Sequence, residues 1–267
     1  MNQCGKDCPA ENPLEQVRLL YTELAQNPGK DFGWRKGKKN ASMLGYADEW
    51  LSRLPDIVWE SAAAVGNPFC LGHIHAGETV IDIGCGAGAD ACIAAVLVGK
   101  EGKVFGIDCT PAMIAKASIN ANVSGLPQAV FQEAEMTELP LPDCTADAVI
   151  SNGAINLARD KDAVLAEAYR VLRPGGRLQI ADMVRETSTE DFAGCSSEGS
   201  WADCVSGTLE PNTFLLKLSR AGFVDVELAG FTGYRTSTST IGALFKAIKP
   251  DQELSVKPAM TGCASAD

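Results

Sequence analysis

The segment "VIDIGCGAGAD", residues 80–90, combines glycines and acids in a pattern suited to binding a small molecule. Gly84, Gly86 and Gly88 follow a short apolar run, and Asp82 precedes them. A glycine-rich turn between a strand and a helix lets a ligand approach the backbone closely, and both dinucleotides and sulfonium cofactors use such loops. The segment therefore predicts a cofactor site and leaves the type of cofactor open.

The charge of Asp82 favours a cationic ligand. A carboxylate about 5 Å from a pyrophosphate would be repelled by roughly 3 kcal/mol at an effective dielectric constant near 20. The same carboxylate attracts the ammonium or sulfonium of S-adenosylmethionine (SAM) by a similar amount. The alternative is that Asp82 accepts hydrogen bonds from backbone amides of the loop.

Two further acidic positions follow the next β-rich runs. Asp108 lies 24 positions after Gly84 at the end of a run, where a carboxylate can accept both ribose hydroxyls of either cofactor. Charge-assisted hydrogen bonds of this type contribute about 1.5 to 3 kcal/mol. Glu135 is predicted to meet the edge of an adenine, with Met136 against its face. The alternative for Glu135 is a solvated loop acid.

Short β-rich runs alternate with helical segments over most of the chain, which predicts a mainly parallel sheet covered by helices. Two strand-like runs within residues 224–250 fit an antiparallel hairpin at the sheet edge. The predicted strands are 79–84, 103–108, 129–134, 146–152 and 177–182, and the predicted helices between them are 90–99, 110–125 and 160–176.

The N-terminal part follows a different pattern. Apolar residues at helical spacing predict a helix over residues 14–25, a surface loop follows at 27–40, and a helical segment over 48–63 is stopped or restarted at Pro55. The predicted organisation is a flexible arm (1–13), a helical lid or substrate segment (14–64), a cofactor-binding domain with C-terminal substrate elements (65–250) and a disordered tail (251–267).

Composition limits the classes of function. The net charge of −11 argues against nucleic acid as a partner. The sequence has neither the apolar core of a signal peptide nor a membrane-spanning run, which predicts a cytoplasmic protein. Its ten cysteines are scattered, which favours reduced thiols, and Cys85, Cys92, Cys109 and Cys144 are interpreted as small buried residues.

Five motifs follow one another along the chain: "VIDIGCGAG", "VFGIDCTPAMIAKA", "AEMTELPLPD", "DAVISNGAINLARDKDAVLAEAYRVLRPGGRLQIAD" and "WADCVSG". Their order is specific in combination. Over residues 44–250 the sequence resembles the class I SAM-dependent methyltransferases, and within them the arsenite methyltransferase family. This resemblance implies a Rossmann-like fold with a seven-stranded, mostly parallel sheet, an antiparallel C-terminal hairpin and N-terminal helices, and SAM as the cofactor.

The resemblance also suggests which residues form the site. The residues expected at the cofactor are Asp82, Gly84, Cys85, Gly86, Asp108, Cys109, Glu135, Met136 and Asn152. The family holds As(III) by three cysteine thiolates, a choice that suits a soft metalloid. Of these positions only Cys204, the proposed catalytic thiol, carries cysteine in this chain, because Val65 and Gly153 stand at the other two. Gly153, Asn156, Cys70 and Cys195 are further candidates for substrate binding, and no metal site is predicted.

The acceptor is expected to be a soft nucleophile. An alcohol or ammonium acceptor needs a general base, but the two histidines, His73 and His75, are interpreted as surface residues and the segment "SNGAINL" offers no base. Arsenite or a related trivalent arsenical, alone or bound to glutathione, is the leading prediction. The alternatives are a small thiol, sulfide or natural product as acceptor, an NAD-dependent oxidoreductase, and a catalytically silent metalloid-binding protein.

Overall fold

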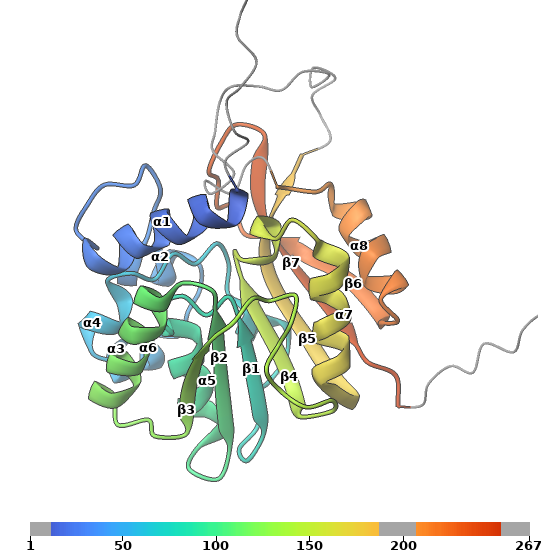
Figure 1. Cartoon of the computed structure of the whole chain (residues 1–267), viewed down its shortest axis with the longest axis horizontal. Helices are drawn as coiled ribbons and strands as arrows, with labels where there is room; N and C mark the ends of the chain where they lie inside the picture. Colours follow the sequence, from blue (N-terminus) through green and yellow to red (C-terminus); the bar gives the residue numbers. More distant parts are fainter. Residues whose placement is uncertain (1–11, 187–206, 252–267) are drawn as a thin grey trace, which may run out of the picture.

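The structure is a computed structural model that describes residues 12–186 and 207–251, which form a seven-stranded sheet with helices on both faces (Figure 1). The predicted alternation of strands and helices is confirmed. In chain order the elements are α1 (Pro13–Gln26), α2 (Gly37–Met43), α3 (Asp48–Arg53), α4 (Asp56–Trp59), the 3-10 turn η1 (Pro68–Leu71), β1 (Thr79–Ile83), α5 (Ala89–Val98), β2 (Lys103–Asp108), α6 (Pro111–Val123), β3 (Ala129–Glu133), β4 (Ala146–Asn152), the 3-10 turn η2 (Ile155–Leu157), α7 (Lys161–Val171), β5 (Leu172–Arg185), α8 (Pro211–Arg220), β6 (Val224–Phe231) and β7 (Thr240–Ile248).

The strands lie in the order β3-β2-β1-β4-β5-β7-β6. Strands β1 to β5 pair in parallel, whereas β7 runs antiparallel to both β5 and β6. The predicted C-terminal hairpin is therefore confirmed, with β7 inserted between β5 and β6. The chain order reverses between β1 and β4, and in such sheets ligands bind in the crevice outside the carboxyl ends of the strands.

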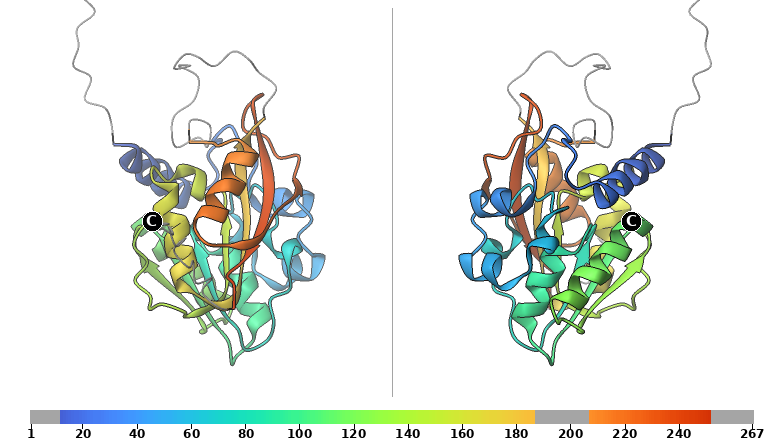
Figure 2. Two further views of the ribbon diagram at one scale, coloured as in Figure 1. Left: turned by 90° about the vertical axis from the view of Figure 1, so that its right-hand side faces the viewer. Right: turned by 90° about the vertical axis from the view of Figure 1, so that its left-hand side faces the viewer.

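Alternate side chains of the central strands pack into two separate cores. Ile81 and Ile83 of β1 pack with residues of α7 and α8 on one face. Val80 of the same strand packs with α5, the end of α6 and the N-terminal helices on the other face. The side views of Figure 2 show the resulting three layers. Because both faces are covered, β1 is almost continuously apolar, and Asp82 is an exception that needs a functional explanation.

The N-terminal helices differ from the prediction at their ends. Helix α1 begins at Pro13, within the predicted arm, because the Asn12 side chain accepts a hydrogen bond from the Leu14 amide (3.2 Å) and proline suits the first helical turn. The predicted loop 27–40 is also too long, since α2 begins at Gly37. The break at Pro55 is confirmed. None of the described helices is long and apolar enough to cross a membrane.

The predicted helix 160–176 is too long by five residues. Helix α7 ends at Val171, and residues 172–176 begin β5 instead. Pro174 has no amide to donate within a helix, and Gly175 has a φ of +73°. The Gly175 amide instead donates to the Lys249 carbonyl (2.9 Å), which ties the start of β5 to the end of β7.

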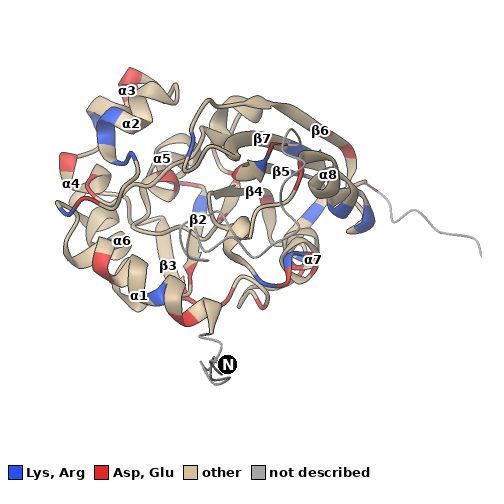
Figure 3. Cartoon of the chain, turned by 90° about the horizontal axis from the view of Figure 1, so that it is seen from above, with Lys and Arg blue, Asp and Glu red and all other residues tan. Residues whose placement is uncertain are grey.

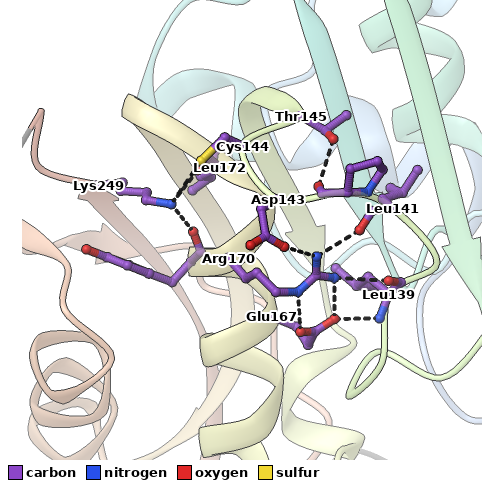
Figure 4. A network of polar contacts seen from close by, with 11 residues as sticks. Leu139, Leu141, Asp143, Cys144, Thr145, Glu167, Arg170, Leu172 and Lys249 are labelled. Atoms are coloured by element: carbon purple, nitrogen blue, oxygen red, sulfur yellow. Dashed lines mark hydrogen bonds and ion pairs between the residues drawn. The ribbon is translucent and has the colours of Figure 1, made fainter. Parts of the chain in front are cut away.

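A polar network anchors α7 to the loop before β4 (Figure 4). The Arg170 guanidinium donates to Glu167 (2.6 and 2.7 Å) and Asp143 (2.8 Å) as well as to two loop carbonyls. Beside it, Lys249 donates to the Tyr169 carbonyl (2.8 Å). Cys144, which was interpreted as buried, is exposed in this loop. It occupies a turn with a φ of +54°, and its sulfur lies 3.8 Å from the Lys249 ammonium.

Candidate functional site

A cavity of about 340 Å³ opens at the carboxyl ends of β1, β2 and β4. This volume lies within the usual range for small-molecule sites. Its lining includes ten of the predicted site residues, which the fold brings together from four separate segments. They are Asp82, Gly84, Cys85, Gly86, Asp108, Cys109, Glu135, Met136, Asn152 and Gly153.

The glycine loop brings its backbone close to the cavity and to β4. The amides of Gly84 and Cys85 both donate to the Ile107 carbonyl (2.8 and 3.0 Å), which locks the start of the loop to β2. Gly84 has a φ of +71°, and a Cβ there would collide with the Cβ of Ala154. Gly86 has a φ of +52°, and a Cβ there would meet no atom within 4 Å. The first glycine therefore allows close packing, and the second keeps the cavity open.

Three carboxylates form what we call the acidic wall of the cavity: Asp82, Asp90 and Asp108. Asp108 accepts hydrogen bonds from the amides of Gly86 (2.9 Å) and Thr110 (2.8 Å), so it also holds the glycine loop. Burial raises the pKa of Asp82 well above its usual value, and the nearby Asp90 and Asp108 carboxylates add to that rise. Burial also raises the pKa of Asp108. A cation in the cavity would relieve this repulsion.

Asp90 belongs to a buried hydrogen-bond network that crosses the cavity. Tyr46 donates to one Asp90 oxygen (2.8 Å), and the Asn152 side chain donates to the other (2.8 Å). Asn152 also accepts from the Val65 amide (3.0 Å) and donates to the Gly66 carbonyl (2.9 Å). Burial raises the pKa of Asp90 to about 6, opposed by the hydrogen bonds from Asn152 and Tyr46. Asn152 thus clamps the 65–66 segment against β4.

Helix α1 covers the other side of the cavity. Figure 3 shows it beside α6 when the molecule is seen from above. The Arg18 side chain donates to the Cys109 carbonyl (3.1 Å) and lies 3.8 Å from a Glu135 oxygen. Val17, Met113 and Met136 add apolar surface to the lining. The region can therefore accept a flat apolar ring with polar edges.

A further part of the lining, which we call the apolar wall, is formed by Ala63, Ala64, Gly153, Ala154 and Leu157. A Cβ on Gly153 would lie 3.2 Å from a methyl carbon of Val65, so the two positions face each other. Val65 itself is buried among apolar residues behind the cavity lining. The side chains of this wall offer neither a thiolate nor a proton acceptor.

Asn156 lies behind the apolar wall and does not line the cavity. Its amide group, oriented so that both ends are paired, donates to Asp182 (2.8 Å) and to the Gly153 carbonyl (3.2 Å). Asp182 also accepts from the backbone amides of Asn156 (3.1 Å) and Met183 (2.7 Å). Burial raises the pKa of Asp182 to about 7. Asn156 and Asp182 therefore hold the 153–157 segment in place.

The remaining predicted residues are not in the cavity lining or cannot be placed. Cys70 is exposed on η1, where its thiol contacts the Asn67 carbonyl (3.0 Å). Cys195 and Cys204 lie outside the described residues. Cys85, Cys92 and Cys109 are buried free thiols, in agreement with their interpretation as small buried residues.

Two residues of the site were missed from the sequence. Asp90 stands two positions after the third glycine, so its place in the first turn of α5 was a usable signal. Tyr46 carried no comparable signal, because it lies in a short segment between α2 and α3 and reaches the cavity only through the tertiary fold. His73 and His75 are exposed, as predicted.

Comparison with known proteins agrees with this geometry. Residues 74–222 match the family model described as a methyltransferase domain. An arsenite methyltransferase of Halobacterium salinarum is 40% identical over 186 residues, which cover 70% of this chain and 47% of that protein. One from Aquipseudomonas alcaligenes is 36% identical and covers 80% of this chain and 63% of that protein. The chain thus spans 47% and 63% of the length of these two relatives.

A solved structure adds support from the fold. The arsenic(III) SAM methyltransferase of Chlamydomonas reinhardtii superposes with a TM-score of 0.54 and 27% identity, over 81% of this chain and 74% of that one. The matching family model covers more than half of the sequence and includes the glycine loop and the whole acidic wall. The chain therefore belongs to the methyltransferase domain family and resembles the arsenite methyltransferases.

Proposed function

We propose that this protein transfers a methyl group from SAM to a soft nucleophile, with trivalent arsenic as the leading acceptor. The observation that carries the proposal is the pairing of a buried acidic wall with a glycine loop in one cavity at the carboxyl edge of the sheet. A cationic cofactor suits this environment, whereas a pyrophosphate would be repelled by it. The NAD-dependent alternative is disfavoured for the same reason.

The residues present fit SAM. One Asp82 oxygen is buried and has no hydrogen-bond partner among the described residues, so it is available to a cationic group. Asp108 is positioned to accept ribose hydroxyls, while Glu135 and Met136 border the space proposed for the adenine. When bound, SAM supplies an electrophilic methyl group. The contribution of this chain is to orient the cofactor and to exclude water from the reacting atoms.

The apolar wall supports a soft acceptor. Ala63, Ala64 and Leu157 cannot remove a proton, and the nearby Tyr46 hydroxyl is already committed to Asp90. Burial and the Asp90 carboxylate raise the pKa of Tyr46 well above 10, so it is a poor general base at neutral pH. A thiolate, hydrosulfide or trivalent arsenical needs no such base. Trivalent arsenic is preferred among these because the matched relatives are named arsenite methyltransferases.

Cys204, which lies outside the described residues, is proposed from the family resemblance as the substrate-contacting thiolate. The test is methyl transfer to arsenite in the presence of glutathione, followed by mass detection of methylated arsenic. Cys204→Ser is expected to abolish turnover while leaving SAM binding intact. Cys144→Ser is the matched control, because Cys144 is exposed and is not part of the cavity lining. Absence of arsenic turnover in the wild-type protein would eliminate arsenite as the acceptor.

A small thiol, sulfide or natural product is the second candidate acceptor. The observation that favours it is the absence of sulfur at both facing positions, Val65 and Gly153. Without these thiolates, As(III) would depend on external thiols to complete its coordination. Turnover of arsenite should then rise steeply with glutathione concentration. A panel of acceptors, analysed for products heavier by one methyl group, separates the two candidates.

A further inference from the structure

Asp82 and Asp90 form a pair of buried acids, and the proposed methyl transfer does not say which charge the pair carries before the cofactor binds. Both residues are buried, with 2% and 8% of their surface exposed, and both line the cavity. Asp90 has a hydrogen-bond donor on each oxygen, from Tyr46 and Asn152. Asp82 accepts a hydrogen bond from the Ala91 amide, and its Oδ2 has no partner among the described residues.

The groups that face this pair increase the cost of two negative charges. Asp108, at the end of β2, adds a third carboxylate, and burial, Asp90 and Asp108 all oppose the charge of Asp82. The negative charge of Asp82 in turn opposes ionisation of Tyr46, Cys85 and Cys92. The Ala91 amide is the group that favours the charged form of Asp82. One proton, held at the unpartnered Oδ2 of Asp82, therefore stabilises the pair until a cation enters the cavity.

We propose that the Asp82–Asp90 pair exchanges a proton for the positive charge of the cofactor, so that SAM binding releases one proton to solvent. This inference rests on the proposed function, because it requires SAM to be the ligand of this cavity. The charges balance: the pair changes from one negative charge to two, and the added charge is compensated by the cation. Asp90 then acts with Asp82 in recognising the cofactor.

The exchange predicts the sign of the pH dependence. A bound cation favours the ionised pair, so the bound protein holds fewer protons than the unbound protein. SAM affinity should therefore rise with pH, by up to roughly tenfold per pH unit where one full proton is exchanged. S-adenosylhomocysteine lacks the sulfonium charge and keeps the ammonium. Its affinity should rise less steeply with pH than that of SAM if the sulfonium is the charge that favours the ionised pair.

Isothermal titration calorimetry tests the exchange directly. SAM is titrated into the wild-type protein at pH 7 in phosphate and in imidazole, two buffers with different heats of ionisation. The apparent binding enthalpy should differ between them, with a slope near one released proton. Equal heats in the two buffers would overturn the proposal. An absence of binding heat with both SAM and S-adenosylhomocysteine would instead overturn the proposed function.

Two variants locate the proton. Asp82→Asn should make the SAM heat independent of buffer and its affinity nearly independent of pH. Asp56→Asn is the control for loss of one acid, because its side chain is 86% exposed on α4, and it should keep the wild-type slope. Thermal melting checks that each variant is folded. If Asp82→Asn does not fold, the difference in heat between the two buffers for the wild-type protein still tests the release of a proton. Asp90→Asn then replaces Asp82→Asn as the variant that locates the proton.

Discussion

The acidic wall and the apolar wall of the cavity differ in how the chain builds them. The acidic wall comes from residues 82–108, a single strand-helix-strand unit whose ends meet at one edge of the sheet. The apolar wall joins residues 63–64 to residues 153–157, and the two segments are linked by the hydrogen bond from the Val65 amide to Asn152 (3.0 Å). Asn156 holds the second segment, and the hydrogen bond from Thr232 to the Val65 carbonyl (2.7 Å) holds the end of the first. One wall is thus set by local geometry and the other by long-range contacts, so substitutions should affect them differently.

The largest effect is expected at the junction of the two walls, with Gly84→Ala. The new Cβ would collide with Ala154, and alanine is strained at a φ of +71°. Overpacking of this kind costs about 1 to 3 kcal/mol, and the backbone conformation adds roughly 1 to 2 kcal/mol. Urea unfolding measures the loss of stability, and calorimetry measures the accompanying loss of SAM binding.

Gly125→Ala is the matched control for that variant. Gly125 has a similar φ of +68°, and a Cβ there would meet no atom within 4 Å. Only the backbone strain should therefore appear, with SAM binding unchanged. Equal destabilisation by the two variants would show that the contact between the glycine loop and Ala154 does not limit stability.

The buried acid behind the apolar wall predicts a pH effect. The folded-state pKa of Asp182 is raised to about 7, so the folded protein keeps a proton that the unfolded chain, with an aspartate pKa near 3.9, loses. The resulting stabilisation is complete below pH 4 and is lost as the pH rises to about 7. The Asp182→Asn variant lacks this proton, so its free energy of unfolding should not fall as the pH rises. Relative to wild type, the variant should therefore gain up to about 4 kcal/mol of stability between pH 4 and pH 7.

Urea unfolding at pH 4, 5, 6, 7 and 8 measures the effect of Asp182→Asn. Asp162→Asn, an exposed position on α7, serves as the control for removal of one acid. A constant difference between Asp182→Asn and wild type across this pH range would mean that Asp182 does not hold a proton in the folded protein.

The contrast between the two walls also explains what the sequence could predict. The glycine loop, Asp82 and Asp108 follow from rules for the ends of parallel strands, and these rules need only local spacing. The sheet and its C-terminal hairpin follow from the alternation of β-rich and helical runs. Tyr46 was missed because its partners, Asp90 and Asn152, are 44 and 106 residues away.

The errors at element ends have a similar cause. The end of α7 was placed too late because the pattern of apolar residues continues into β5, and only Pro174 and Gly175 mark the change.

Cys70 was considered as a substrate ligand from its distance along the chain to Val65. The fold instead directs its thiol to the Asn67 carbonyl, on the surface of η1.

Tyr46→Phe tests whether the two walls communicate. The change keeps the ring contacts with Trp59 and Phe69 but removes the hydroxyl between Asp90 and Asn152. Loss of a buried hydrogen-bond partner costs about 1 to 3 kcal/mol. Steady-state kinetics should show a higher KM for the acceptor, because the 65–66 segment loses part of its clamp. Tyr169→Phe, outside the cavity lining, is the control. If Tyr46→Phe leaves the KM for the acceptor unchanged, the hydrogen-bond network around Asp90 does not influence the apolar wall.

The smallest effect is expected at the surface of the acidic side, where Arg18 joins α1 to the cavity. Arg18→Gln loses the hydrogen bond to the Cys109 carbonyl and the long contact with Glu135, whose side chain is 52% exposed. Exposed ion pairs contribute roughly 0 to 1 kcal/mol, so the KM for SAM should rise by only a few-fold. Lys30→Gln breaks another exposed ion pair, with Glu23 (2.7 Å), outside the cavity lining and should leave this KM unchanged. If both variants raise the KM for SAM equally, the loss of a positive charge near α1 explains the effect, and the Cys109 contact does not.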